Sequence, residues 1–302
     1  MTYATPTTVN GRPPVTIACA PPSGSLFNVG ATTVVCTAAD ALQRTDSCSL
    51  TITVTPPVIP ILAVTSFLAF GDSITRGEDG TNGPANPPCS ITASARMQFG
   101  PRVILPNAQT YPGVLAQSLI ARYRAQSPTV DNQGCPGEAV TDSGTLPRFD
   151  GLIRSRRYEA VLIMEGSNDL MLAVRDRNVL ASALVGLRQL VGDAKSRGLR
   201  PLLATIPPIN PAGSRGKDWG ADMVPDFNTG IRGIALGESV PLVDVHAAFN
   251  GNLALLGPDG LHPTAEGYRV VAGAFADAIA NALEIPPAPK ATATLRSPFR
   301  RR

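Results

Sequence analysis

The stretch SFLAFGDSIT, residues 66–75, decides the fold of most of this chain. Its first half, residues 66–70, is almost wholly apolar, which is typical of a short strand buried on both faces. A Gly-Asp-Ser turn follows at once, so the hydroxyl of Ser73 stands where the buried strand ends. The stretch therefore predicts a parallel sheet that carries polar groups at its strand ends.

The chain beyond this stretch alternates between apolar strands and amphipathic helices. Such alternation indicates a parallel sheet covered by helices on both faces. We predict an α/β fold, a three-layer α/β/α sandwich, with strands at residues 66–70, 129–132, 160–165, 201–206 and 241–245. Helices are expected at residues 111–124, 178–197, 225–236 and 264–283.

Polar blocks recur near later strand ends or in late loops. They read Asn-Gln-Gly at 132–134, Gly-Ser-Asn-Asp at 166–169 and Asp-Gly-Leu-His-Pro at 259–263. Ligands of open parallel sheets bind beyond the carboxyl ends of the strands. We therefore expect these blocks and Ser73 to form a single site.

With the Gly-Asp-Ser-Ile-Thr block at 71–75, these blocks resemble the SGNH (GDSL-like) hydrolase family in order and spacing, over about residues 67–283. The resemblance implies a flavodoxin-like five-stranded sheet and a serine ester hydrolase that needs no metal or organic cofactor. It assigns the oxyanion hole to the backbone N–H groups of Ser73 and Gly134 and to the side-chain amide of Asn168. Glycine suits the second position because a backbone without a Cβ can approach the substrate closely.

The residues themselves supply a nucleophile, a base and an orienting carboxylate. Ser73 is the predicted nucleophile, and its alternative role is that of a helix N-cap. The chain has two histidines; His246 lies beside an apolar strand and is interpreted as structural, whereas His262 lies in a polar loop and is the predicted base. Asp259 is expected to orient the imidazole of His262, with a turn aspartate as its alternative role.

Two other acidic residues and one long loop lie beside these blocks. Asp72 and Asp169 are interpreted as carboxylates that accept backbone N–H groups and organise loops, not as an acid/base pair. Residues 78–109 are rich in Pro, Gly and Asn, and we expect them to form a loop that walls the substrate cleft.

Residues 1–57 follow a different pattern, with alternating β-branched runs such as residues 32–36 and 49–54. Residues 19–56 resemble the hyalin-repeat (HYR) module, and this resemblance implies an immunoglobulin-like β-sandwich. The match departs from the family at residues 41–44, which read Ala-Leu-Gln-Arg. Residues 58–63 are expected to be a stiff linker, residues 64–284 the hydrolase domain, and residues 285–302 a Pro/Arg-rich solvated tail.

The five cysteines have no zinc-type spacing, and their Thr/Ser/Pro-rich setting favours disulfides in an oxidising compartment. Cys36 and Cys48 would lie opposite each other on a hairpin, so they form one candidate pair, and Cys19 is the competing partner. Cys89 and Cys135 form the second candidate pair, which would tie the long loop to the segment that carries Gly134. Two free thiols are the alternative. One cysteine must stay unpaired.

The composition of the chain argues against some kinds of binding partner. Hydrophobic residues make up 43% of the 302 residues and charged residues 16%, so the chain can bury a large core. The net charge of +3 and the absence of a basic, aromatic-rich face argue against nucleic acid. The longest apolar stretch, residues 58–70, is too short to span a membrane. We expect a secreted monomer, with no signal peptide visible at residue 1.

The predicted function is hydrolysis of short-acyl esters, with acetyl esters of carbohydrates as the candidate substrates. A general short-chain esterase or lipase is the alternative. An alternative of another class is an inactive extracellular glycan-binding or adhesion protein, but such a protein would be expected to have lost one of the five site residues, and none is missing.

Overall fold

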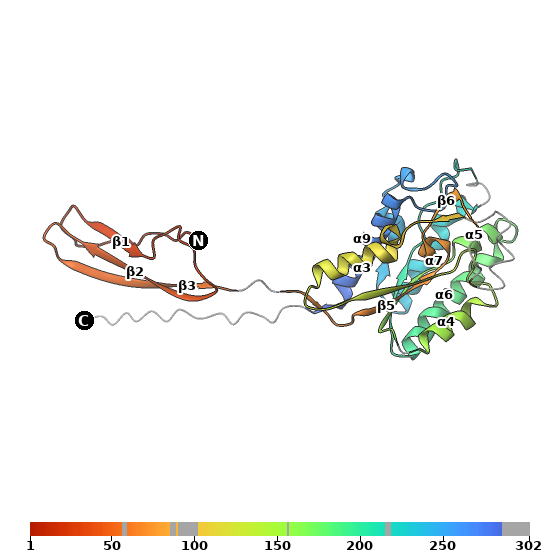
Figure 1. The fold of residues 1–302 in the computed structure, drawn as a ribbon, viewed down its shortest axis with the longest axis horizontal. Helices are drawn as coiled ribbons and strands as arrows, with labels where there is room; N and C mark the ends of the chain where they lie inside the picture. The colour runs from red at the N-terminus through yellow and green to blue at the C-terminus, as the bar shows by residue number, and fades with distance from the viewer. Residues whose placement is uncertain (56–58, 85–88, 90–101, 156, 215–218, 286–302) are drawn as a thin grey trace. The chain divides into compact units, whose positions relative to one another are not determined.

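The computed structural model describes residues 1–55, 59–84, 89, 102–155, 157–214 and 219–285. The chain divides into two compact units, Met1–Val58 and Ile59–Arg302 (Figure 1). The larger unit contains the stretch at residues 66–75 and carries the candidate site. The predicted tail at residues 286–302 lies outside the described residues.

The larger unit is built on a five-stranded parallel sheet, as predicted. In spatial order its strands are β11 (Leu242–Val243), β10 (Arg200–Ala204), β9 (Ala160–Met164), β5 (Ser66–Gly71) and β8 (Thr129–Gly134). All four strand pairings within this sheet are parallel. The first strand in sequence lies next to the second and the third, which is the flavodoxin-like order.

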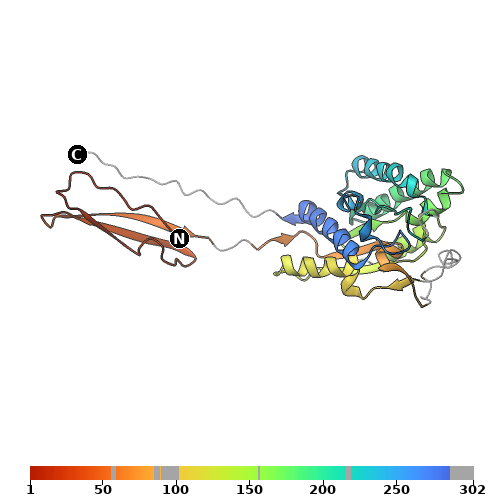
Figure 2. The same ribbon diagram turned by 90° about the horizontal axis from the view of Figure 1, so that it is seen from above.

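Helices cover both faces of this sheet, which confirms the three-layer architecture (Figures 1 and 2). One layer holds α3 (Tyr111–Arg122) and α9 (Ala265–Leu283), which pack against each other, with Tyr111 stacked on Phe275. The other layer holds α4 (Thr145–Ile153), α6 (Asn178–Ser196) and α7 (Val224–Gly237). The short helices are α1 (Ser73–Arg76), α5 (Ser167–Ala173), α8 (Val245–Ala248), η2 (Asn107–Gln109), η4 (Ala221–Met223) and η5 (Leu253–Leu255).

Burial explains why the first strand decides the fold. Phe67, Leu68, Ala69 and Phe70 are completely buried because helices cover both sides of β5. A strand with apolar side chains on both faces is stable only in such a covered position. The remaining strands of the sheet therefore assemble around β5 and bring their carboxyl ends to one edge.

Two short strand pairs were not predicted. β4 (Ile61–Leu62) pairs with β12 (Glu284–Ile285), so the expected linker at residues 58–63 is wrong in its second half. Leu62 is buried, which anchors this segment to the larger unit. β6 (Glu78–Asn82) pairs with β7 (Arg102–Ile104), so the ends of the expected loop at 78–109 form a hairpin; most of its middle lies outside the described residues.

The smaller unit is a β domain, as predicted, but residues 1–55 contain a single antiparallel sheet and no second sheet of a sandwich. Its strands are β1 (Thr16–Ala20), β2 (Gly30–Ala39) and β3 (Thr45–Val54), in that order. Its fully enclosed core is small and consists of Val34, Cys36 and Ile52. The turn after β2, at residues 41–44, is held by Asp40, which accepts hydrogen bonds from the backbone N–H groups of Leu42 and Arg44.

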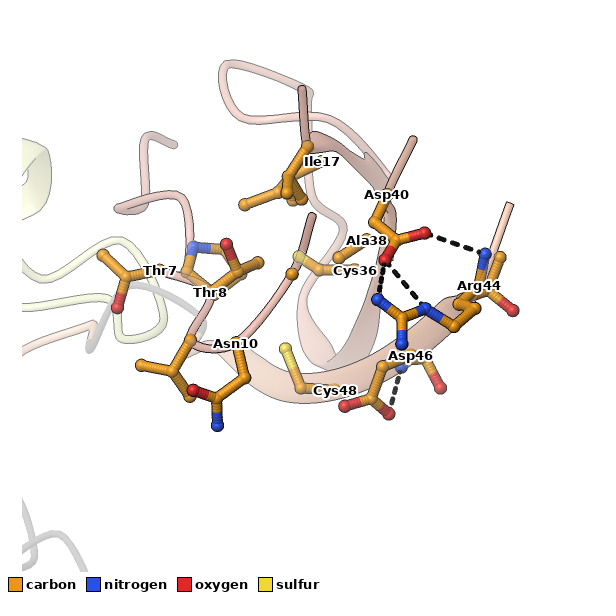
Figure 3. A pocket seen from close by; sticks show the side chains of 16 residues that line it. Thr7, Thr8, Asn10, Ile17, Cys36, Ala38, Asp40, Arg44, Asp46 and Cys48 are labelled. Atoms are coloured by element: carbon orange, nitrogen blue, oxygen red, sulfur yellow. Dashed lines mark hydrogen bonds and ion pairs between the residues drawn. The ribbon is translucent and has the colours of Figure 1, made fainter. Parts of the chain in front are cut away.

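The disulfide of this unit corrects the predicted Cys36–Cys48 pair. The structure joins Cys36 to Cys19 and leaves Cys48 free, and Figure 3 shows Cys36 and Cys48 side by side in a pocket of this unit. Cys36 lies on the central strand, in register with both other cysteines. Its Cα atom is 4.0 Å from that of Cys19, which is the closely spaced kind of antiparallel pair. A central residue faces one neighbour closely and the other widely, so Cys19 is the better placed partner.

Candidate active site

Ser73 lies where β5 opens into α1, at the carboxyl edge of the sheet. It is the first residue of α1, and the helix N-cap is Asp72, whose side chain accepts a hydrogen bond from Ile74 N–H. The alternative role of Ser73 as the N-cap is therefore wrong. Because Asp72 satisfies this need of the backbone, the hydroxyl of Ser73 is left for chemistry.

The structure brings Ser73, His262 and Asp259 together in one hydrogen-bonded chain. His262 Nε2 lies 2.8 Å from Ser73 Oγ, and His262 Nδ1 lies 2.7 Å from Asp259 Oδ2. All three residues are almost fully buried. An ionised Asp259 accepts only, so Nδ1 carries a proton and a neutral ring presents the lone pair of Nε2 to the serine hydroxyl.

The loop around Asp259 explains how the chain is held. Asp259 Oδ1 accepts hydrogen bonds from the backbone N–H groups of Leu261 and His262, which leaves Oδ2 for the ring. Burial opposes ionisation of Asp259, but the hydrogen bond and positive charge of His262 outweigh it and lower the pKa of the carboxyl. For His262, burial likewise opposes the charged form, but hydrogen bonding and attraction from Asp259, with the charges of Glu78 and Asp72, raise the pKa of the imidazole.

Two of the three predicted oxyanion donors have an N–H group available for a ligand. The backbone N–H of Ser73 has no hydrogen-bond partner among the described residues, since it is the first amide of α1. Asn168 lies in the first turn of α5, directly beyond β9, and is buried. Its Nδ2 donates to the carbonyl of Glu138 at 2.8 Å, which orients the amide and leaves its second hydrogen for a ligand.

Gly134 is placed differently from the expectation. Its N–H donates to Asn132 Oδ1 at 3.0 Å, so this donor is already occupied. A Cβ at Gly134 would meet the backbone of Arg76 at 2.1 Å, so glycine is required here for packing against α1 rather than for contact with a substrate. Three residues further on, Gly137 is partly exposed, has φ +78°, and has no partner for its N–H among the described residues. The second glycine of the sequence Gly-Cys-Pro-Gly was the signal for it.

The loop-organising roles predicted for Asp72 and Asp169 agree with the structure. Asp169 accepts hydrogen bonds from the backbone of Val140 and Thr141, so it organises the loop after β8, as Asp72 organises α1. His246 lies in α8 and donates its backbone N–H to the hydroxyl of Thr205. It takes no part in the chain of hydrogen bonds to Ser73.

Two buried charged residues beside His262 were missed. Glu78 begins β6, and its Oε2 lies 3.4 Å from His262 Nε2. Arg102 begins β7, and its Nε lies 3.4 Å from Asp259 Oδ2. Neither contact follows from a motif, because the hairpin that carries both residues lies within the predicted loop.

An ion pair and a disulfide hold the loop that follows β8. Arg148 of α4 forms an ion pair with the fully buried Glu138, donates to the carbonyls of Gln133 and Gly71, and lies over the ring of Phe70 at 4.1 Å. The predicted disulfide between Cys89 and Cys135 is present, with Cys135 fully buried.

Within the described ranges, no group of three or more His, Cys, Asp and Glu side chains is arranged to hold a metal ion. In the same part of the chain, no helix combines the length and the apolar character that a membrane span requires.

Comparison with known proteins agrees with this geometry. The chain belongs to the GDSL-like Lipase/Acylhydrolase family, whose model matches residues 69–270. The parallel sheet, the flanking helices and this match define a carboxylic ester hydrolase of the SGNH type. A search of curated proteins finds no match.

Several solved structures share the fold. An acetylxylan esterase from Geobacillus stearothermophilus is 25% identical, with 71% of this chain and 94% of that chain covered and a TM-score of 0.52. An aryl esterase from M. smegmatis is 18% identical, covering 72% and 99%, with a TM-score of 0.56. A lipase/acylhydrolase from Enterococcus faecalis is 20% identical, covering 74% and 100%, also with a TM-score of 0.56. At these lower identities the last two show the fold alone.

Proposed function

We propose that the protein is a serine esterase that hydrolyses short-acyl esters, with acetyl esters of carbohydrates as its substrates. The observation that carries the proposal is the buried chain from Ser73 Oγ through the imidazole of His262 to Asp259. Such a chain activates a hydroxyl by removing its proton as it attacks a carbonyl carbon. The carbohydrate part of the proposal is supported by the likeness to the acetylxylan esterase.

In the proposed mechanism, His262 Nε2 takes the proton of Ser73 as Oγ attacks the ester carbonyl. The developing oxyanion accepts hydrogen bonds from Ser73 N–H and the Asn168 amide. We assign the third donor to Gly137 N–H, because the Gly134 N–H is occupied by Asn132. The imidazolium then protonates the departing alcohol, and water activated by the same ring releases the acid from the acyl-enzyme.

We further propose that the protein is secreted and that its smaller unit is a shortened relative of the hyalin-repeat module. Secretion is supported by the two disulfides, Cys19–Cys36 and Cys89–Cys135, because such bonds persist in oxidising compartments. The hyalin-repeat relation is supported by the sequence of residues 19–56 and by the β2–β3 hairpin that this sequence forms.

The test of the proposed function is a comparison of initial rates on acetylated xylooligosaccharides, p-nitrophenyl acetate and p-nitrophenyl decanoate. We expect kcat/KM to be higher for both acetyl esters than for the decanoate, and Ser73→Ala to abolish all three rates. A preference for the decanoate would contradict the short-acyl proposal. Equal rates for the intact chain and Ser73→Ala would contradict the serine mechanism.

A further inference from the structure

The imidazole of His262 lies between two carboxylates, not one. Asp259 occupies the Nδ1 side, and Glu78 Oε2 lies 3.4 Å from Nε2, the nitrogen that faces Ser73. Glu78 belongs to β6, which is distant in sequence from the loop that carries Asp259 and His262. Glu78 is only 4% exposed. The contact therefore joins two separate elements inside the site.

The position of Glu78 is fixed by close packing. Its carbonyl accepts a hydrogen bond from Tyr268 of α9 at 2.5 Å. Two residues on, Gly80 has φ +83°, and a Cβ there would lie 2.5 Å from Asp259 Oδ1. A Cβ at Gly257 would lie 2.0 Å from the carbonyl of Asp79. The first strand of the hairpin thus lies directly against the loop that carries the histidine.

The charges around the ring favour its protonated form. Among the described residues, two carboxylates, Asp259 and Glu78, and one guanidinium, that of Arg102, lie around the ring, so with both carboxylates ionised a neutral imidazole leaves one negative charge uncompensated. Asp72, on the β5 side, adds further negative potential to the extent that it is ionised; burial raises the pKa of this carboxyl to about 6. In a neutral ring the lone pair of Nε2 would also face the Glu78 oxygen, whereas an Nε2–H would donate toward it.

We propose that Glu78 is a positioning residue that stabilises the imidazolium form of His262 and thereby sets the pH at which Ser73 becomes activated. The proposal rests on the role of His262 as the base in the proposed function. The imidazolium forms in the transition state, where Glu78 stabilises it, but in the resting enzyme it cannot accept a proton. Glu78 therefore moves the onset of activity to higher pH.

The direction of the pKa shift of His262 agrees with this assignment. Among the groups that raise the pKa of His262, Glu78 follows Asp259. Burial raises the pKa of Glu78 above its ordinary value even though the charges of His262 and Arg102 lower it, so Glu78 acts on the ring only above this raised pKa. Removing the negative charge at Glu78 must then lower the pKa of His262, so the acid limb of kcat/KM moves to lower pH.

The experiment is an NMR titration of the two histidine side chains in the full chain, with His246→Gln used for assignment. We expect Glu78→Gln to lower the pKa of His262 by about 0.5–1 pH unit, with the acid limb of kcat/KM shifted equally. The matched control is Asp79→Asn, which removes the same charge from the neighbouring residue; in the described structure the Asp79 carboxylate bonds to Thr81 and not to the ring, so both values should stay unchanged.

An unchanged pKa of His262 in folded Glu78→Gln, or an equal fall in Asp79→Asn, would overturn the proposal. If Glu78→Gln does not fold, Glu78→Asp decides, since withdrawal of the carboxylate by one methylene should lower the pKa by a smaller amount, and no fall contradicts the role. The titration does not depend on turnover. An inactive wild type with a pKa that responds to Glu78 would therefore contradict the proposed function alone.

Discussion

At the scale of single residues, the site depends on the different hydrogen-bond partners of the two carboxylate oxygens of Asp259. Oδ1 is held by two backbone N–H groups of its own loop, so Oδ2 is fixed opposite His262 Nδ1. This arrangement selects the tautomer that can accept a proton from Ser73. An amide at this position could present an N–H to the ring and stabilise the opposite tautomer.

Asp259→Asn should therefore lower kcat by about 10³–10⁴-fold while KM changes little. Although burial opposes ionisation, the hydrogen bond and charge of His262 lower the pKa of Asp259, so the wild-type carboxylate is ionised at neutral and alkaline pH and its replacement should lower kcat throughout that range. Steady-state kinetics between pH 6 and pH 9 check this. A variant within tenfold of the wild type would show that the carboxylate does not orient the ring.

The residues at the site differ in how far the sequence predicts them. Ser73 and His262 follow from short blocks and from the presence of only two histidines. The sequence Gly-Cys-Pro-Gly offers both Gly134 and Gly137, and only the hydrogen bond of Gly134 N–H to Asn132 reveals that the first of these donors is occupied. The contact of Glu78 with His262 joins residues distant in sequence, and no local pattern encodes such a contact.

At the scale of elements, α4 stabilises the carboxyl ends of β5 and β8 and the loop that follows β8. Arg148 bonds to the carbonyls at the ends of β5 and β8 and pairs with Glu138, which is completely buried. A buried carboxylate without its cation is costly because it has lost its water. Arg148 thus holds the side chain of the same residue, Glu138, whose carbonyl accepts the hydrogen bond from Asn168.

Arg148→Met should lower the free energy of unfolding by about 3–5 kcal/mol, because it leaves Glu138 buried and unpaired. The control is Arg154→Met, which breaks an exposed ion pair with Asp150 near the end of the same helix and should cost about 0–1 kcal/mol. Urea unfolding followed by circular dichroism measures both. Equal losses would mean that the buried pair has no special role.

The main elements were predictable because each has a clear period and length. All five strands of the large sheet and its four long helices lie within a few residues of their expected ranges. The hairpin of β6 and β7 was missed because its strands are short and flank a Pro- and Gly-rich segment. The Cys36–Cys48 prediction failed for a related reason, since the sequence does not show that Cys36 lies on a central strand with two neighbours.

At the scale of the whole molecule, the chain is two units, and every residue of the candidate site comes from the second. The boundary of this unit is set by β4, whose Leu62 is buried and whose backbone N–H donates to Gln126. The sequence predicted two units but placed β4 in the linker, because two residues are too few to show a period.

Two truncations test this boundary. A chain of residues 59–302 should retain the kcat of the full chain. A chain of residues 64–302 lacks β4 and should be less stable by about 1.5–3 kcal/mol, the value of one buried leucine. Thermal unfolding and steady-state kinetics of the two chains check this. Equal melting temperatures would mean that residues 59–63 belong to the linker and do not stabilise the larger unit.

The most direct test of Ser73 as the nucleophile is covalent labelling by diisopropyl fluorophosphate, followed by mass spectrometry of the whole chain and of its peptides. We predict one adduct, on the peptide that contains Ser73, formed in parallel with the loss of esterase activity. The adduct should be absent in Ser73→Ala and slow to form in His262→Gln, because the hydroxyl then lacks its base. An adduct on another serine, or hydrolysis that persists in Ser73→Ala, would contradict the assignment of Ser73 as the nucleophile.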